Sequence, residues 1–280
     1  MKTFTIISLL IVSCCVAGAT PVLYHGCTPA GLPVRRFLGI SLTDSMDFIR
    51  WRLEIDQDHY KLSCSYGLCQ PSTNGFSNEQ TVAWQGSHTK QGIYYTLEHN
   101  GKTFYIMEIN ASLLHLLDEK RHMLSGNGGW SYTLNNTNVV ISGECLAPAS
   151  KQTIQDATAF EGRTPCQPLS RLIKRQSSEA CNKLKWFIIF FTDSITKQPA
   201  YYLIGGRQYR PETMRKGAWK IERRSDGRPV YILDPEKGEA AVHLLQAAEN
   251  ILLFTDGKGQ LLVGNDDFSY TLSKTYLRHQ

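Results

Sequence analysis

Apolar and polar side chains alternate along much of the chain, and this pattern predicts β-strands rather than helices. Within Phe48–Asp56 every second side chain is apolar and falls on one face: Ile49, Trp51, Leu53 and Ile55. Similar short segments follow one another with Gly, Asn or Asp between them, as in an antiparallel meander. Further strands are predicted at His59–Ser65, Gln80–Gln85, Gly92–His99, Lys102–Asn110, Leu113–Leu117, Trp130–Leu134, Leu184–Asp193, Ala200–Gly205, Gly217–Arg223, Val230–Leu233, Asn250–Thr255 and Phe268–Leu272.

Two local signals refine this pattern. Asn100-Gly101 lies between two aromatic segments, and this dipeptide is the strongest short signal for a tight β-hairpin. Only Leu169–Lys183 has a helical pattern, and it is weak.

The chain also contains an internal repeat. Gly126-Asn-Gly-Gly-Trp-Ser-Tyr-Thr-Leu134 returns as Gly264-Asn-Asp-Asp-Phe-Ser-Tyr-Thr-Leu272, so equivalent positions differ by 138. Further matches occur in the same order at offsets of 135 to 138: Tyr24–Pro29 with Phe160–Pro165, Trp51 and Trp84 with Trp186 and Trp219, and Leu113–Asp118 with Ile251–Asp256. Such a series indicates a duplication.

The repeat divides the chain into two units of similar length. Repeat 1 is expected at 20–145 and repeat 2 at 159–280, joined by an exposed linker at 146–158 that is rich in Ala, Ser and Gln. Because closure removes exposed sheet edges, each unit is predicted to form a small antiparallel β-barrel or half-barrel. The predicted fold class is therefore all-β, with two such barrels in tandem.

Composition fits a folded protein and locates its charge. Hydrophobic residues make up 42% and charged residues 20% of the chain, ordinary values for a globular protein. The net charge of +5 lies in the second half, where residues 151–280 carry 20 Lys or Arg against 14 Asp or Glu. No nucleic-acid-binding motif accompanies this excess, so we expect no nucleic-acid partner.

The N-terminus is typical of an exported protein. Lys2 precedes a mostly apolar run, and Ala17 and Ala19 suit signal-peptidase cleavage, which predicts a signal peptide at 1–19. In a second interpretation, Ile11-Val-Ser-Cys14 is a lipobox and Cys14 carries a lipid anchor. The apolar run is shorter than the roughly 20 residues of a membrane-spanning helix. We therefore expect a periplasmic or outer-membrane-associated protein, with membrane contact only through that anchor.

The second unit resembles the N-terminal domain of the NlpE family, envelope lipoproteins of copper homeostasis and stress sensing. The matching segments are Gly162-Arg-Thr-Pro-Cys166, Gly217-Ala-Trp219 and Leu252–Leu272, and the first unit matches more faintly. The resemblance implies a lipocalin-like barrel at the outer membrane, and copper enters only through it. The family's Cys-x-x-Cys is missing, because Leu169 follows Cys166 at the third position and Ala30 replaces the first Cys in repeat 1.

Six cysteines follow the predicted signal peptide, and in an exported chain an even number favours disulfides. Cys64 and Cys69 are separated by four residues at a predicted turn, which suggests a local bridge. Through the family resemblance, Cys166 and Cys181 take the place of the short Cys-x-x-Cys, and we expect them to be crosslinked across an insert. Either pair is a candidate disulfide or redox site.

Patterns for enzymatic chemistry or a bound metal are missing from the sequence. No nucleophile elbow, HExxH motif or phosphate loop occurs, so a non-enzymatic protein without a cofactor is predicted. The eight histidines lack metal-ligand spacing, so no metal site is predicted from them.

Two surface features leave the function open. The tryptophans suit core packing or the lining for a hydrophobic ligand. A basic group around Gly217-Ala-Trp219 suits a solvated strand edge, or contact with lipid phosphates or an acidic partner, through Arg215, Lys216, Arg223 and Arg224. The leading hypothesis is an NlpE-like envelope protein, and the alternatives are a lipocalin-like carrier and an envelope interaction module.

Overall fold

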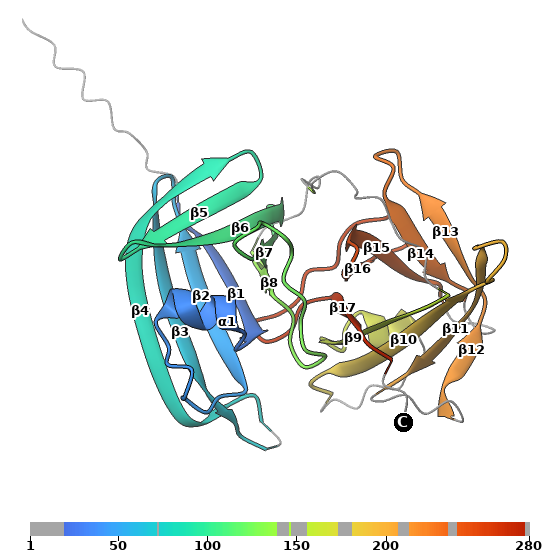
Figure 1. The fold of residues 1–280 in the computed structure, drawn as a ribbon, viewed down its shortest axis with the longest axis horizontal. Helices are drawn as coiled ribbons and strands as arrows, with labels where there is room; N and C mark the ends of the chain where they lie inside the picture. The colour runs from blue at the N-terminus through green and yellow to red at the C-terminus, as the bar shows by residue number, and fades with distance from the viewer. Residues whose placement is uncertain are drawn as a thin grey trace, which may run out of the picture.

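A computed structural model describes residues 20–71, 73–138, 146, 156–172, 181–206, 213–234 and 240–277. Two β-barrels lie side by side and confirm the predicted all-β, tandem-barrel fold (Figure 1). The predicted signal peptide, Cys14, Cys145, His279 and most of the expected linker lie outside the described residues.

The first barrel is closed by eight antiparallel strands, each paired with the next in sequence. The last strand returns to the first, with His25 opposite Asn135. The strands are β1 (Val22–Pro29), β2 (Phe48–Ile55), β3 (His59–Cys69), β4 (Phe76–Gln91), β5 (Tyr94–His99), β6 (Lys102–Asn110), β7 (Leu113–Leu116) and β8 (Thr133–Asn135).

The second barrel is a nine-stranded sheet that repeats this strand order and is nearly closed, because one strand is broken in two. Its elements are β9 (Ala157–Thr164), β10 (Leu184–Thr192), β11 (Pro199–Gly205), β12 (Arg215–Gly217), β13 (Trp219–Arg223), β14 (Pro229–Leu233), β15 (Val242–Ala248), β16 (Ile251–Thr255) and β17 (Thr271–Thr275). β12 pairs with β11 and β13 pairs with β14, while only Ala218 separates β12 from β13. The bent β12–β13 segment therefore takes the place of the single long β4, which pairs with both β3 and β5.

Several predicted elements differ from the structure. β1 and β9 open their barrels but were not among the predicted strands, and β9 begins at Ala157, inside the expected linker. Helix α2 covers only Leu169–Leu172, and residues 173–180 lie outside the described part of the chain. The predicted hairpin is present, with φ of 48° at Asn100 and 72° at Gly101, as a tight turn of this kind requires.

Helix α1 (Leu32–Leu38) was missed by the hydrophobic pattern because it is only seven residues long. Its local signals are a Pro in the first turn and Gly39 in the left-handed conformation at its end. Val34, Phe37 and Leu38 are buried in the core of the first barrel, so α1 closes one end of that barrel.

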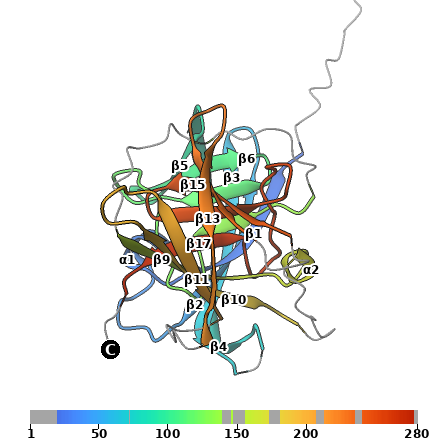
Figure 2. The same ribbon diagram turned by 90° about the vertical axis from the view of Figure 1, so that its right-hand side faces the viewer.

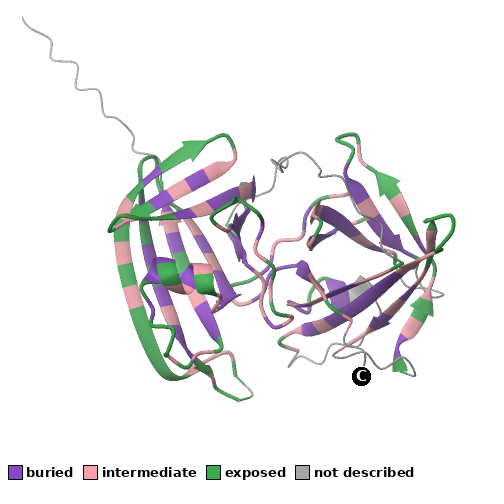
Figure 3. Ribbon diagram, viewed as in Figure 1, coloured by how far each residue is buried: buried purple, intermediate pink, exposed green. Residues whose placement is uncertain are grey.

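Side chains of the protein itself fill both barrels. Buried positions alternate with more exposed ones along the strands (Figure 3). In the first barrel Trp51, Leu53 and Ile106 have no exposed surface, and in the second the same holds for Ile188 and Phe254. Close aromatic and aliphatic packing of this kind stabilises a small barrel from within.

The two barrels dock through equivalent surfaces. Ser131 lies 2.6 Å from Ser269 and Thr133 lies 3.0 Å from Thr271, and each pair joins positions that differ by 138. Two further bonds are reciprocal: the Gly126 amide donates to Ser273 Oγ at 2.7 Å, and the Gly264 amide donates to Asn135 Oδ1 at 3.0 Å. Contacts of residue i with its own counterpart define a local two-fold axis between the barrels.

An apolar cluster surrounds this axis. Both barrels contribute buried side chains, including the equivalent pairs Met107 and Leu245, Leu113 and Ile251, and Met123 and Leu261. Burying these side chains away from water stabilises the docked arrangement.

Candidate functional site

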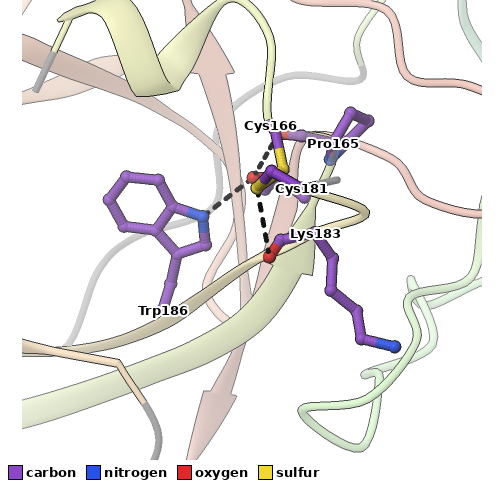
Figure 4. Close-up of a disulfide and its surroundings, with 6 residues drawn as sticks. Pro165, Cys166, Cys181, Lys183 and Trp186 are labelled. Atoms are coloured by element: carbon purple, nitrogen blue, oxygen red, sulfur yellow. Dashed lines mark hydrogen bonds between the residues drawn. A yellow bond between two sulfur atoms is a disulfide. The ribbon is translucent and has the colours of Figure 1, made fainter. Parts of the chain in front are cut away.

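The Cys166–Cys181 disulfide expected from the family resemblance is present, with Cα atoms 6.2 Å apart (Figure 4). Cys166 is buried in the core of the second barrel together with Leu169 of α2 and Trp186 of β10. Figure 2 shows α2 beside the second barrel. The crosslink therefore ties the α2 side of the insert to the start of β10 in the second barrel. In the first barrel, the corresponding helix α1 is held by apolar packing instead.

The local bridge suggested for Cys64 and Cys69 is absent, and both residues are free thiols. Residues between them continue strand β3 rather than forming a turn, with a bulge between Tyr66 and Leu68. Five residues of extended chain separate Cα atoms by about 16 Å, whereas a disulfide needs roughly 4.4–6.8 Å. Cys64 is completely buried, and this burial raises the pKa of its thiol.

The basic residues around Gly217-Ala-Trp219 are divided between two places. Arg215 and Lys216 belong to β12, and the Lys216 ammonium lies 3.9 Å from the centre of the Tyr201 ring. Arg223 ends β13 and donates to the Gly227 carbonyl at 3.0 Å, while Arg224 donates to the Gly259 carbonyl at 3.3 Å. The four predicted contact residues therefore come from the first strand of the β12–β13 segment and from the end of the second.

Histidines and tryptophans lie in different surroundings. Among the described residues, no group of three or more His, Cys, Asp or Glu side chains is placed to hold a metal ion. Three of the tryptophans are buried inside the barrels: Trp51, Trp186 and Trp219. Trp130 is only half-buried and lies outside the strands, shortly before β8. Within the same described ranges, no helix is long and apolar enough to cross a membrane.

His115 is completely buried near the two-fold axis. Its Nδ1 lies 2.9 Å from Thr133 Oγ1 and its Nε2 lies 3.0 Å from the Leu124 carbonyl. Because Leu124 offers only an acceptor, the hydrogen-bond network assigns the ring proton to Nε2, which donates to it. Burial lowers the pKa of His115 to about 4, so the ring is neutral near pH 7.

A polar site crosses the junction between the barrels. Asp267, in the turn before β17, accepts a bond from Arg50 of β2 at 3.2 Å and another from the Asn74 side chain at 2.7 Å. Cys27, opposite Arg50 in the β1–β2 pairing, places its sulfur 3.7 Å from the same carboxylate. Burial, and then the charge of Asp267, raise the pKa of the Cys27 thiol, so it stays protonated.

Sequence reasoning missed this junction site. Nothing in the hydrophobic pattern places Asp267 beside Arg50, which is 217 positions away. The signal that could have found it is the alignment of the repeats, since Asp267 corresponds to Gly129 and so one repeat carries a charge that the other lacks.

Comparisons with known proteins identify no relative. No family model matches the sequence, and neither the curated proteins nor the solved structures include a significant match. The resemblance to the NlpE family therefore stays a hypothesis.

Proposed function

We propose that this chain is a non-enzymatic envelope protein, exported through residues 1–19, that acts in copper homeostasis or envelope-stress sensing through its outer surface. The feature that carries the surface role is the filled interior of both barrels, in which Trp51 and Phe254 have no exposed surface. A disulfide is in keeping with an exported chain. The copper or stress role rests on the family resemblance alone.

The filled cores disfavour the alternative of an internal carrier. A lipocalin-like carrier needs room for a hydrophobic molecule, and here the central positions are occupied by Trp51, Leu53, Ile106 and their neighbours. A ligand inside either barrel would have to displace these side chains. Native mass spectrometry of the gently extracted protein separates the two functions, because a co-purifying lipid would favour the carrier.

A deletion strain tests the proposed role. Its growth on graded copper and its envelope-stress reporters should differ from wild type, and the full gene should restore both. A gene that lacks codons 2–19 is the matched control and should fail to restore them, because its product is not exported. Wild-type copper tolerance together with unchanged reporters would contradict the proposed role.

A further inference from the structure

His115 lies on the face of β7 that points toward the junction of the two barrels. Side chains along a strand alternate between its two faces. Leu114 and Leu116 are in the core of the first barrel, whereas Leu113 belongs to the apolar cluster at the two-fold axis. His115 shares the face of Leu113 and is completely buried there. It therefore belongs to the junction rather than to the interior of the first barrel.

A chain of hydrogen bonds runs from this ring to the second barrel. The Thr271 hydroxyl donates to Thr133 Oγ1 at 3.0 Å, and Thr133 Oγ1 lies 2.9 Å from His115 Nδ1. Since the ring proton is on Nε2, Nδ1 is an acceptor and takes the proton of the Thr133 hydroxyl. The directions of these bonds fit a neutral His115.

A second proton on the ring would disrupt this chain. The new Nδ1–H would point at Thr133 Oγ1, and the Thr133 proton would have to turn toward Thr271, whose own proton already lies between the two oxygens. The ring would also carry a buried positive charge, which costs free energy unless an anion or water faces it.

No anion of the described chain faces His115. The residues opposite it on β6 and β8 are Met107 and Thr133. Charged side chains on the surrounding elements pair with one another instead: Glu108 with Lys90, Asp118 with His122, and Lys274 with Glu249. Burial is accordingly the first cause of the lowered pKa of His115, and no neighbouring charge contributes to it.

The second repeat shows that the docked arrangement does not need a histidine at this position. Leu253 is the equivalent of His115 and is buried in the same apolar cluster at the axis. A titratable group is therefore present on one side of the junction only, where an apolar side chain would complete the packing equally well.

We propose that the junction is an acid-sensitive switch, in which protonation of His115 opens the contact between two folded barrels. Opening lets water reach the charged ring, while the apolar cores inside the two barrels stay packed. It also exposes the apolar cluster at the axis, including Met107, Leu113 and Ile251, as a surface that is hidden at neutral pH. The switch does not depend on the proposed role in copper homeostasis or stress sensing.

Hydrogen exchange of the full mature protein, followed by NMR, tests the switch. The Gly126 and Gly264 amides report on the junction, because they donate across it to Ser273 Oγ and Asn135 Oδ1. Their protection factors, the intrinsic exchange rate divided by the observed rate, should fall about 100-fold between pH 7 and pH 4, because opening returns the pKa of the histidine from about 4 to near 6.5. The Trp51 amide in the first barrel should stay better protected than both glycines.

Two results with the wild-type protein would overturn the proposal. One is unchanged protection of Gly126 and Gly264 at pH 4. The other is exchange of the Trp51 amide as fast as that of the two glycines, because acid would then unfold the first barrel instead of separating it from the second.

His115→Leu is the decisive variant, because it introduces the side chain that the second repeat already has at this position. It leaves the carboxylates of the junction in place, including Asp267, so any acid effect that comes from them remains. Protection of Gly126 and Gly264 should fall much less in this variant than in wild type. His59→Gln, at a side chain that is 73% exposed, is the control and should behave as wild type. If His115→Leu fails to fold, His115→Gln serves in its place, and a wild-type loss of protection in either folded variant would contradict the switch.

Discussion

At the scale of single residues, the repeated Gly-x-Thr-Pro segment has a structural reason in both barrels. Thr28 Oγ1 accepts the indole N–H of Trp51 at 2.8 Å, and Thr164 does the same for Trp186 at 2.8 Å. Gly26 and Gly162 allow the first strand of each barrel to approach the last strand. A β-carbon on Gly162 would lie 2.7 Å from the Thr271 carbonyl oxygen, closer than side chains normally come.

Gly162→Ala should therefore destabilise the second barrel. Overpacking of this kind costs about 1–3 kcal/mol of the free energy of unfolding, measured by urea denaturation. Gly257→Ala is the matched control, because a β-carbon there meets nothing within 4 Å. Equal free energies of unfolding for the two variants would contradict the close packing of β9 against β17 at Gly162.

The buried His115 should make stability depend on pH. Its pKa is about 4 when folded and near 6.5 when unfolded, so between these values the unfolded chain binds more protons. The free energy of unfolding should consequently fall as the pH drops from about 6.5 to about 4, by roughly 3 kcal/mol in total. The measurement is urea denaturation at pH 4, 5, 6 and 7, which gives the free energy of unfolding at each pH.

His115→Gln keeps polar atoms at this place but cannot take up a proton. Relative to wild type, it should lose less stability on acidification. His59→Gln is the control, since that side chain is 73% exposed and should leave the acid loss unchanged. If His115→Gln lost as much stability as wild type on acidification, the buried neutral histidine would not be the cause.

At the scale of elements, the two barrels close their ends by different means. In the first, Phe37 of α1 stacks on Phe104 with ring centres 4.7 Å apart. In the second, the shorter α2 is held beside the Cys166–Cys181 crosslink. The structure thus assigns to a covalent bond in repeat 2 the task that apolar packing performs in repeat 1.

Removal of the crosslink should cost stability without changing the fold. The double variant Cys166→Ser and Cys181→Ser should lose about 3 kcal/mol in the free energy of unfolding, the chain-entropy value for a loop of this length. Cys69→Ser, at a half-exposed free thiol, should change it by less than about 0.5 kcal/mol. A double variant as stable as wild type would mean that the crosslink does not stabilise α2 and β10.

The elements that the sequence predicts well are those with regular alternation, such as the strand at Trp51 and the hairpin at Asn100. β1 and β9 were missed because Gly26 and Gly162, each followed by a Thr-Pro pair, resemble turn residues, although both glycines in fact allow close packing of strands. The prediction of a Cys64–Cys69 bridge was wrong because Ser65–Leu68, which looks like a turn in the sequence, continues strand β3. The junction site could not be predicted, since it depends on how two distant units dock.

At the scale of the whole molecule, the central feature is the docking of two equivalent barrels about a local two-fold axis. Ser131 and Ser269, and Thr133 and Thr271, meet their own counterparts there, and apolar side chains from both barrels surround them. Such an interface resembles that of a two-fold dimer, joined here by one chain. Its stability should consequently not depend on the peptide connection between the barrels.

Cutting that connection measures this most directly. With a protease site inserted between Leu146 and Asp156, the cleaved protein should still elute as one species on size-exclusion chromatography and give the summed mass of both halves by native mass spectrometry. Thr133→Arg combined with Thr271→Arg places like charges on the axis, and after cleavage this variant should separate into two barrels. Separation of the unmutated halves at the same concentration would contradict the docked arrangement.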